Sequence, residues 1–167
     1  KTRFSSSPLP TTQFLDELTT AQQYIDELTA AGVDQIVLVT HYTYEGDLAL
    51  AAGLTGVDVI VGGDSHTLLG EQLAAFGLSP AGPYPTRTTD AEGNLVCVVQ
   101  AWQYSWVVGH LEVVFDGDGD VVSCDGTPHV ILGDTIPEGP ARDLVDATPE
   151  LSIVTPDPAA QAILDTY

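Results

Sequence analysis

Two strand-like runs separated by a short helical segment constrain the fold of this chain more than any other feature. Val33–Thr40 and Val57–Gly63 are rich in valine and isoleucine, which is typical of strands covered on both faces. Residues 44–56, between them, have the pattern of a short helix. Strand, helix and strand within about 30 residues form a βαβ unit, which predicts two parallel strands joined by a crossover.

The flanking segments complete a mixed α/β prediction. Apolar residues recur at helical spacing within residues 11–32, with Thr11 or Thr12 as the expected cap and Gly32 as the expected end. Residues 71–92 are rich in glycine and proline and predict a long loop. Residues 95–132 predict antiparallel strands joined by Gly/Asp turns.

Two further short helices are predicted beyond Ile136, the second over Pro158–Tyr167. The predicted fold class is therefore α/β in the form of an α+β sandwich, with a parallel βαβ unit followed by antiparallel strands.

The charge of the chain excludes some classes of partner. It has 24 acidic residues against 4 Lys+Arg, a net charge of -20. A nucleic acid or an anionic membrane requires a basic face, so we expect neither as a partner. A solubility or salt adaptation and cation binding by some carboxylates both remain open. No apolar run approaches 18 residues, so no membrane-spanning helix is predicted. No signal peptide is visible and the chain starts at Lys1, so we expect a mature or trimmed product.

The two cysteines allow two interpretations. Cys97 and Cys124 each lie in a strand-like run, and the intervening turn at 116–120 has the composition of a hairpin that would bring these strands side by side. A disulfide between them would indicate an oxidising compartment. Two buried free thiols in a reducing cytosol are the alternative.

Candidate metal ligands follow both strands of the βαβ unit. His41 comes after the first strand, and Asp64 and His66 come after the second. Ligands bind at the carboxyl ends of parallel strands, and imidazole with carboxylate suits Zn, Mn or Fe. Gly62–Gly63 would allow a sharp exit, after which Asp64 and His66 would project to one side of an extended turn. Asp47 could orient the His41 imidazole from outside the ligand set. Each histidine could equally be a structural hydrogen-bonding residue.

Other polar residues give weaker signals. His110 and His129 lie in the antiparallel part without a partner pattern, and we interpret both as structural or surface residues. The acidic turn Asp116–Asp120 could bind a cation, but an EF-hand needs a glutamate where this chain has Thr127.

The segment "GVDQIVLVTHYTYEGDLALAAGLTGVDVIVGGDSHTLLG" resembles the calcineurin-like metallophosphoesterases, and more narrowly their 5′-nucleotidase and UDP-sugar hydrolase branch. The later stretch over residues 84–122 resembles the closing strands of the same branch. The likeness extends over about residues 12–165. It implies a four-layer fold and hydrolysis of nucleotides or related phosphomonoesters. In such enzymes two divalent cations (Zn, Mn, Mg or Ca) clamp the phosphate and activate a hydroxide.

The resemblance also implies roles for three side chains. His41 and Asp64 would hold the second metal, and His66 would hold the first. Asp64 stands where the family usually has a histidine. A carboxylate there would favour Mn, Mg or Ca relative to Zn, or would weaken the site.

The family's upstream motifs Asp-x-His, Gly-Asp and Gly-Asn-His-Glu do not occur in this chain, and the catalytic histidine is expected upstream of it. Residues 1–154 would therefore be the C-terminal half of a catalytic domain, and residues 155–167 the start of an interdomain linker helix. The partners of this chain would be the N-terminal half of the catalytic domain and a C-terminal substrate domain. We expect the fragment alone to be inactive and the enzyme to be periplasmic or extracellular. A non-catalytic acidic binding or assembly module with a relict fold is the alternative.

Overall fold

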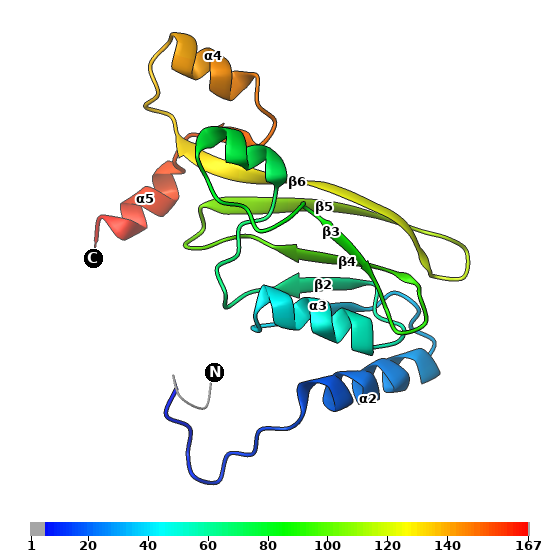
Figure 1. Cartoon of the computed structure of the whole chain (residues 1–167). Helices are drawn as coiled ribbons and strands as arrows, with labels where there is room; N and C mark the ends of the chain where they lie inside the picture. The colour runs from blue at the N-terminus through cyan, green and yellow to red at the C-terminus, as the bar shows by residue number, and fades with distance from the viewer. Residues whose placement is uncertain (1–5, 167) are drawn as a thin grey trace.

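The protein is described by a computed structural model, which places residues 6–166 (Figure 1). Its elements in chain order are α2 (Glu17–Ala30), β1 (Val37–Val39), α3 (Tyr44–Gly53), β2 (Val59–Gly62), the 3-10 helix η1 (Glu71–Phe76), β3 (Thr86–Thr89), β4 (Leu95–Gln100), β5 (Val107–Phe115), β6 (Val121–Gly133), α4 (Pro140–Asp146), β7 (Leu151–Val154) and α5 (Pro158–Leu164). Within these residues, no helix has the length and apolar character needed to cross a membrane.

The βαβ prediction is confirmed. β1 and β2 pair in parallel, with Val37 opposite Val59, and α3 makes the crossover between them. The Thr43 hydroxyl caps α3 by accepting a hydrogen bond from the Gly46 amide at 3.0 Å. α3 buries Leu50 against the sheet, as Figure 1 shows for the helix as a whole. The first sheet has the strand order β1-β2-β4-β3.

The first strand is less covered than its sequence predicts. β1 is an edge strand of the four-stranded sheet, and the side chains of Val37 and Val39 are 56% and 75% exposed. The prediction of a strand covered on both faces is therefore wrong for the part of the chain that the structure describes. Valines on an open edge are a surface that proteins usually cover.

α2 begins later than predicted and ends where predicted. The Asp16 carboxylate accepts a hydrogen bond from the Thr19 amide at 2.8 Å and caps the helix, so Thr11 and Thr12 lie outside it. Gly32 has φ +86°, the left-handed conformation that commonly ends a helix.

The second half of the chain forms a separate three-stranded sheet, β5-β6-β7. β5 and β6 make a long antiparallel hairpin, and the Asp116 carboxylate closes its turn by accepting the amides of Asp118 and Asp120. β7, which the sequence analysis missed, is parallel to β6. The predicted loop over residues 71–92 contains η1 and β3, and β4 is parallel to β2 and antiparallel only to β3.

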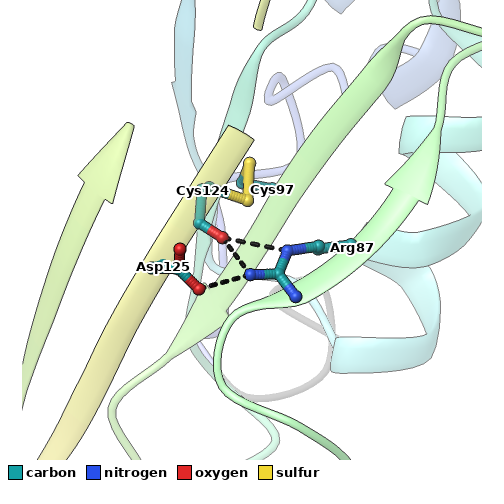
Figure 2. Close-up of a disulfide and its surroundings, with 4 residues drawn as sticks. All are labelled: Arg87, Cys97, Cys124 and Asp125. Carbon is teal, nitrogen blue, oxygen red and sulfur yellow. Dashed lines mark hydrogen bonds and ion pairs between the residues drawn. A yellow bond between two sulfur atoms is a disulfide. The ribbon is translucent and has the colours of Figure 1, made fainter. Parts of the chain in front are cut away.

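A disulfide joins the two sheets. Cys97 on β4 and Cys124 on β6 are both fully buried and bonded, with a Cα–Cα distance of 6.4 Å. Figure 2 shows Arg87 beside this bond: its guanidinium donates to the Cys124 carbonyl and pairs with the Asp125 carboxylate. The disulfide interpretation is confirmed, but its predicted geometry is wrong, because the hairpin at 116–120 joins β5 to β6 and not the two cysteine strands.

The Asp90 carboxylate organises the turn between β3 and β4. This buried carboxylate accepts hydrogen bonds from the amides of Glu92, Asn94 and Gly56. Burial alone would raise its pKa, but the hydrogen bonds from Asn94, Gly56 and Glu92 outweigh burial and hold the pKa of Asp90 below its ordinary value.

We expect Asp90→Asn to lower the free energy of unfolding most clearly at neutral pH. A depressed pKa means that the carboxylate stabilises the fold above its unfolded pKa of about 3.9, and that this contribution is lost as the pH falls through the folded value. The difference in the free energy of unfolding between Asp90→Asn and the wild type, measured by urea unfolding, should therefore shrink as the pH is lowered from 5 to 3. Asp118→Asn, in the exposed hairpin turn, is the matched control and should show no such trend. A difference independent of pH would contradict the assignment.

Candidate metal centre

The predicted ligands His41 and Asp64 lie together at the carboxyl edge of the parallel pair. β1 ends at Val39 and β2 at Gly62, so both chains leave the sheet at the same edge. The His41 Nε2 atom lies 3.2 Å from Asp64 Oδ1. The His41 side chain is 78% exposed, whereas the Asp64 side chain is only 9% exposed. The imidazole therefore faces solvent and the carboxylate is mostly buried.

The distance between these two donor atoms suits a shared cation. Two ligands held at about 2.1 Å from one ion are separated by roughly 3.0 Å at octahedral angles and 3.4 Å at tetrahedral angles. Imidazole and carboxylate together suit Zn or Mn. His41 and Asp64 therefore fit as part of a ligand set. Among residues 6–166, however, no three His, Cys, Asp or Glu side chains are grouped so that they could hold an ion.

His66 is placed away from this pair. Its ring packs edge-on against Tyr104, with the ring centroids 5.3 Å apart. The backbone explains the separation: Asp64 and His66 have φ of +64° and +53°, which is left-handed and not extended. The extended turn on which the sequence analysis based its alternation argument is therefore not formed. Left-handed residues other than glycine cost about 1 to 2 kcal/mol each, so contacts around the loop must hold them.

The loop from Gly63 to Thr67 is held mainly by one buried side chain. The Gln100 amide nitrogen donates to the Gly63 carbonyl at 3.0 Å, and its amide oxygen accepts from the Thr67 backbone N–H. Gln100 ends β4 and pairs with Gly62 at the end of β2. The sequence analysis missed this residue, although a lone polar side chain closing the buried run "LVCVVQ" was a usable signal.

Hydroxyl groups complete the support of the loop. The Ser65 hydroxyl accepts from the Tyr44 backbone N–H at 3.1 Å, which ties the loop to the start of α3. It also lies 2.7 Å from the Thr67 hydroxyl. The sequence analysis did not single out Ser65 or Thr67.

Asp47 is fully buried behind the loop. Its Oδ1 accepts from the Thr40 hydroxyl at 2.7 Å, while its Oδ2 has no hydrogen-bond partner among the described residues. Asp47 thus contacts Thr40, the residue before His41, and not the His41 imidazole that the sequence analysis expected it to orient. Burial raises the pKa of Asp47, although the Thr40 hydrogen bond opposes this effect.

Close packing explains Gly62, the last residue of β2, but not Gly63 at the start of the loop. A Cβ on Gly62 would lie 2.1 Å from Asp47 Oδ2, which no real side chain tolerates. A Cβ on Gly63 would lie 3.4 Å from the Thr40 carbonyl and 3.5 Å from His41 Nδ1. Gly62 is therefore needed for close approach to the buried Asp47 carboxylate, a role that the sequence analysis did not predict, while Gly63 faces only ordinary contacts.

A cavity of about 650 Å³ opens beside the ligand pair. His41 and Asp64 line one part of it, and the start of α2 contributes Asp16 and Glu17. The pocket therefore carries acidic groups from two elements, which favours a cation over a free anion.

Comparisons with known proteins show which proteins this chain is similar to. The chain is 40% identical over 133 residues to a probable 5′-nucleotidase of Treponema pallidum, a match covering 79% of this chain and 22% of that protein. A 5′-nucleotidase precursor from Thermus thermophilus superposes with a TM-score of 0.68 at 49% identity, over 74% of this chain and 24% of the other.

The Haemophilus influenzae NAD nucleotidase gives a TM-score of 0.85 at 27% identity, over 93% of this chain and 30% of the other. A comparison with protein-family models finds no match. This chain thus spans between about a fifth and a third of the length of the proteins it resembles.

Proposed function

Because this chain belongs to the 5′-nucleotidase branch of the metallophosphoesterase superfamily, we propose that it supplies part of the catalytic domain of a metal-dependent phosphomonoesterase acting on nucleotides. The observation that carries the proposal is the 3.2 Å approach of His41 Nε2 and Asp64 Oδ1 at the carboxyl edge of β1 and β2. Such an edge is where parallel α/β sheets bind their ligands.

In this proposal His41 and Asp64 hold one divalent cation, and His66 contributes to the site of a second. Bound cations would polarise the phosphoryl oxygens and lower the pKa of an attacking water. The chain's own contribution is to orient the ligands. Asp47 fixes Thr40, the residue before His41, and thereby restrains the backbone that carries the imidazole.

Residues 1–154 would form the C-terminal half of the catalytic domain, and residues 155–167 the start of the linker helix to a substrate domain. The open edge of β1, with Val37 and Val39 exposed, supports a further protein segment covering this side of the sheet. The remaining metal ligands and the catalytic histidine would come from that segment, so we propose that this chain alone does not turn over substrate.

The proposed location is the periplasm or the cell exterior. The buried Cys97–Cys124 bond supports this, because disulfides persist in oxidising compartments.

The test is metal binding and hydrolysis by the full-length protein. We expect it to hydrolyse a nucleoside monophosphate when Mn²⁺ is supplied and to lose this activity on chelation. Asp64→His should shift the preference from Mn²⁺ toward Zn²⁺, because it replaces a hard carboxylate with an imidazole. His129→Ala is the control and should change neither metal preference nor rate, because the His129 imidazole lies on β6, 3.1 Å from the Ser152 hydroxyl. Hydrolysis unaffected by chelation would contradict the proposal.

A non-catalytic acidic binding or assembly module is the second candidate. It is favoured by the lack of a three-ligand group among residues 6–166 and by the net charge of -20. The coding sequence upstream of Lys1 discriminates the two. Asp-x-His and Gly-Asn-His-Glu motifs there would support the enzyme, and a gene that starts near Lys1 would support the module.

A further inference from the structure

We propose that Gln100 is a positioning residue that sets the conformation of the metal-ligand loop and thereby the affinity for the divalent cation. This inference rests on the proposed function, because it concerns the loop that carries Asp64 and His66. Gln100 itself touches neither of these side chains in the hydrogen bonds described above, so it would act through the backbone.

The placement of Gln100 gives it access to both ends of the loop. It is the last residue of β4, it is 3% exposed, and it pairs with Gly62 in the parallel register of β2 and β4. Its side chain therefore lies beneath the point where β2 ends and the loop begins. A primary amide carries both a donor and an acceptor, and this position uses both.

The Gln100 side-chain amide forms hydrogen bonds with both ends of the loop. At the start, the amide nitrogen donates to the Gly63 carbonyl at 3.0 Å. At the end, the amide oxygen accepts from the Thr67 backbone N–H, and also from the Ser65 hydroxyl at 3.2 Å. One side chain thus closes a five-residue loop across its base and holds its central serine.

This closure explains how two non-glycine residues of the loop can keep a left-handed backbone conformation. Asp64 and His66 adopt left-handed φ values between the two anchored ends. Left-handed conformations of non-glycine residues persist only where the surroundings over-determine them. Without the Gln100 amide, the Gly63 carbonyl and the Thr67 N–H would lose these partners, and the loop would relax away from the geometry that presents Asp64 to His41. Losing a group that orients ligands typically weakens metal binding by about 10- to 100-fold.

The experiment compares Gln100→Met with Gln103→Met in the full-length protein. Methionine keeps the volume and removes every hydrogen bond of the amide. Gln103, in the following loop, has no side-chain hydrogen bond in the part of the chain that the structure describes, so it is the matched control. Mn²⁺ affinity is measured by EPR titration at a temperature where every variant is fully folded, and hydrogen exchange is followed in the peptide that spans Gly63–Thr67.

We expect Gln100→Met to bind Mn²⁺ about 10- to 100-fold more weakly and to exchange faster across Gly63–Thr67, with Gln103→Met unchanged in both. If Gln100→Met does not fold, Ser65→Ala removes one contact of the same clamp and should weaken Mn²⁺ binding several-fold. Wild-type affinity in the folded variant overturns the role of Gln100 and leaves the metal centre intact. A wild-type protein that does not bind Mn²⁺ overturns both.

Discussion

Replacing His66 with alanine in the full-length protein is expected to reduce phosphomonoester hydrolysis by a factor of about 10³ or more, with little change in the fold. In the proposed function His66 is a metal ligand, and a lost ligand removes several kcal/mol of transition-state stabilisation, where each 1.36 kcal/mol is worth about tenfold in rate. The imidazole is exposed and packs edge-on against Tyr104, so its removal leaves the core intact. Steady-state kinetics with Mn²⁺ and far-UV circular dichroism measure the two effects.

His110→Ala is the matched control for this experiment. His110 is also exposed, but it lies on β5, where its Nε2 atom is 3.6 Å from Glu112 Oε1. Its removal should leave the hydrolysis rate unchanged. If His66→Ala retains the wild-type rate with Mn²⁺, His66 is not a ligand, and the metal centre must be rebuilt around His41 and Asp64. A loss of rate accompanied by unfolding would instead assign His66 a structural role.

The parts of the fold that follow from local pattern could be predicted from sequence. The valine-rich runs and the helix between them predict a parallel pair, and the direction of that pair places His41 and Asp64 at one edge. Strand partners that are distant in the chain could not be predicted. β4 inserts between β2 and β3, and β7 pairs with β6, because apolar periodicity reports which residues are buried and not which strand lies alongside.

The detailed geometry of the site depends on tertiary contacts. Asp64 and His66 turn left-handed because Gln100 anchors the loop from another strand, and a sequence window around the loop does not contain Gln100. The same holds for α2, where Asp16 rather than an earlier threonine provides the cap. Asp47 was singled out because it follows His41 by six residues, but its actual partner, Thr40, depends on how α3 packs on the sheet.

Removing the disulfide is expected to lower the free energy of unfolding by about 3.5 kcal/mol at 25 °C, as follows from the loop-entropy relation for a sequence separation of 27 residues. The bond joins β4 to β6 within an inter-sheet apolar cluster that also contains Val59 and Val121. The hydrogen bonds from Arg87 to the Cys124 carbonyl would remain, since they use the backbone. The double variant Cys97→Ala/Cys124→Ala tests this in urea unfolding.

Reduction of the wild type provides the internal control. A strong reductant added to the wild type should lower its urea midpoint to near that of the double variant, and the same reductant should leave the double variant unchanged. Since Cys97 and Cys124 are fully buried, reduction should be slow until the protein is partly unfolded, so the reductant is added in denaturant before refolding. Equal midpoints for the oxidised and reduced wild type would show that the two sheets hold together without the covalent bond. The disulfide would then no longer support the proposed periplasmic or extracellular location. A protein whose stability does not depend on the bond would fold equally well in a reducing cytosol.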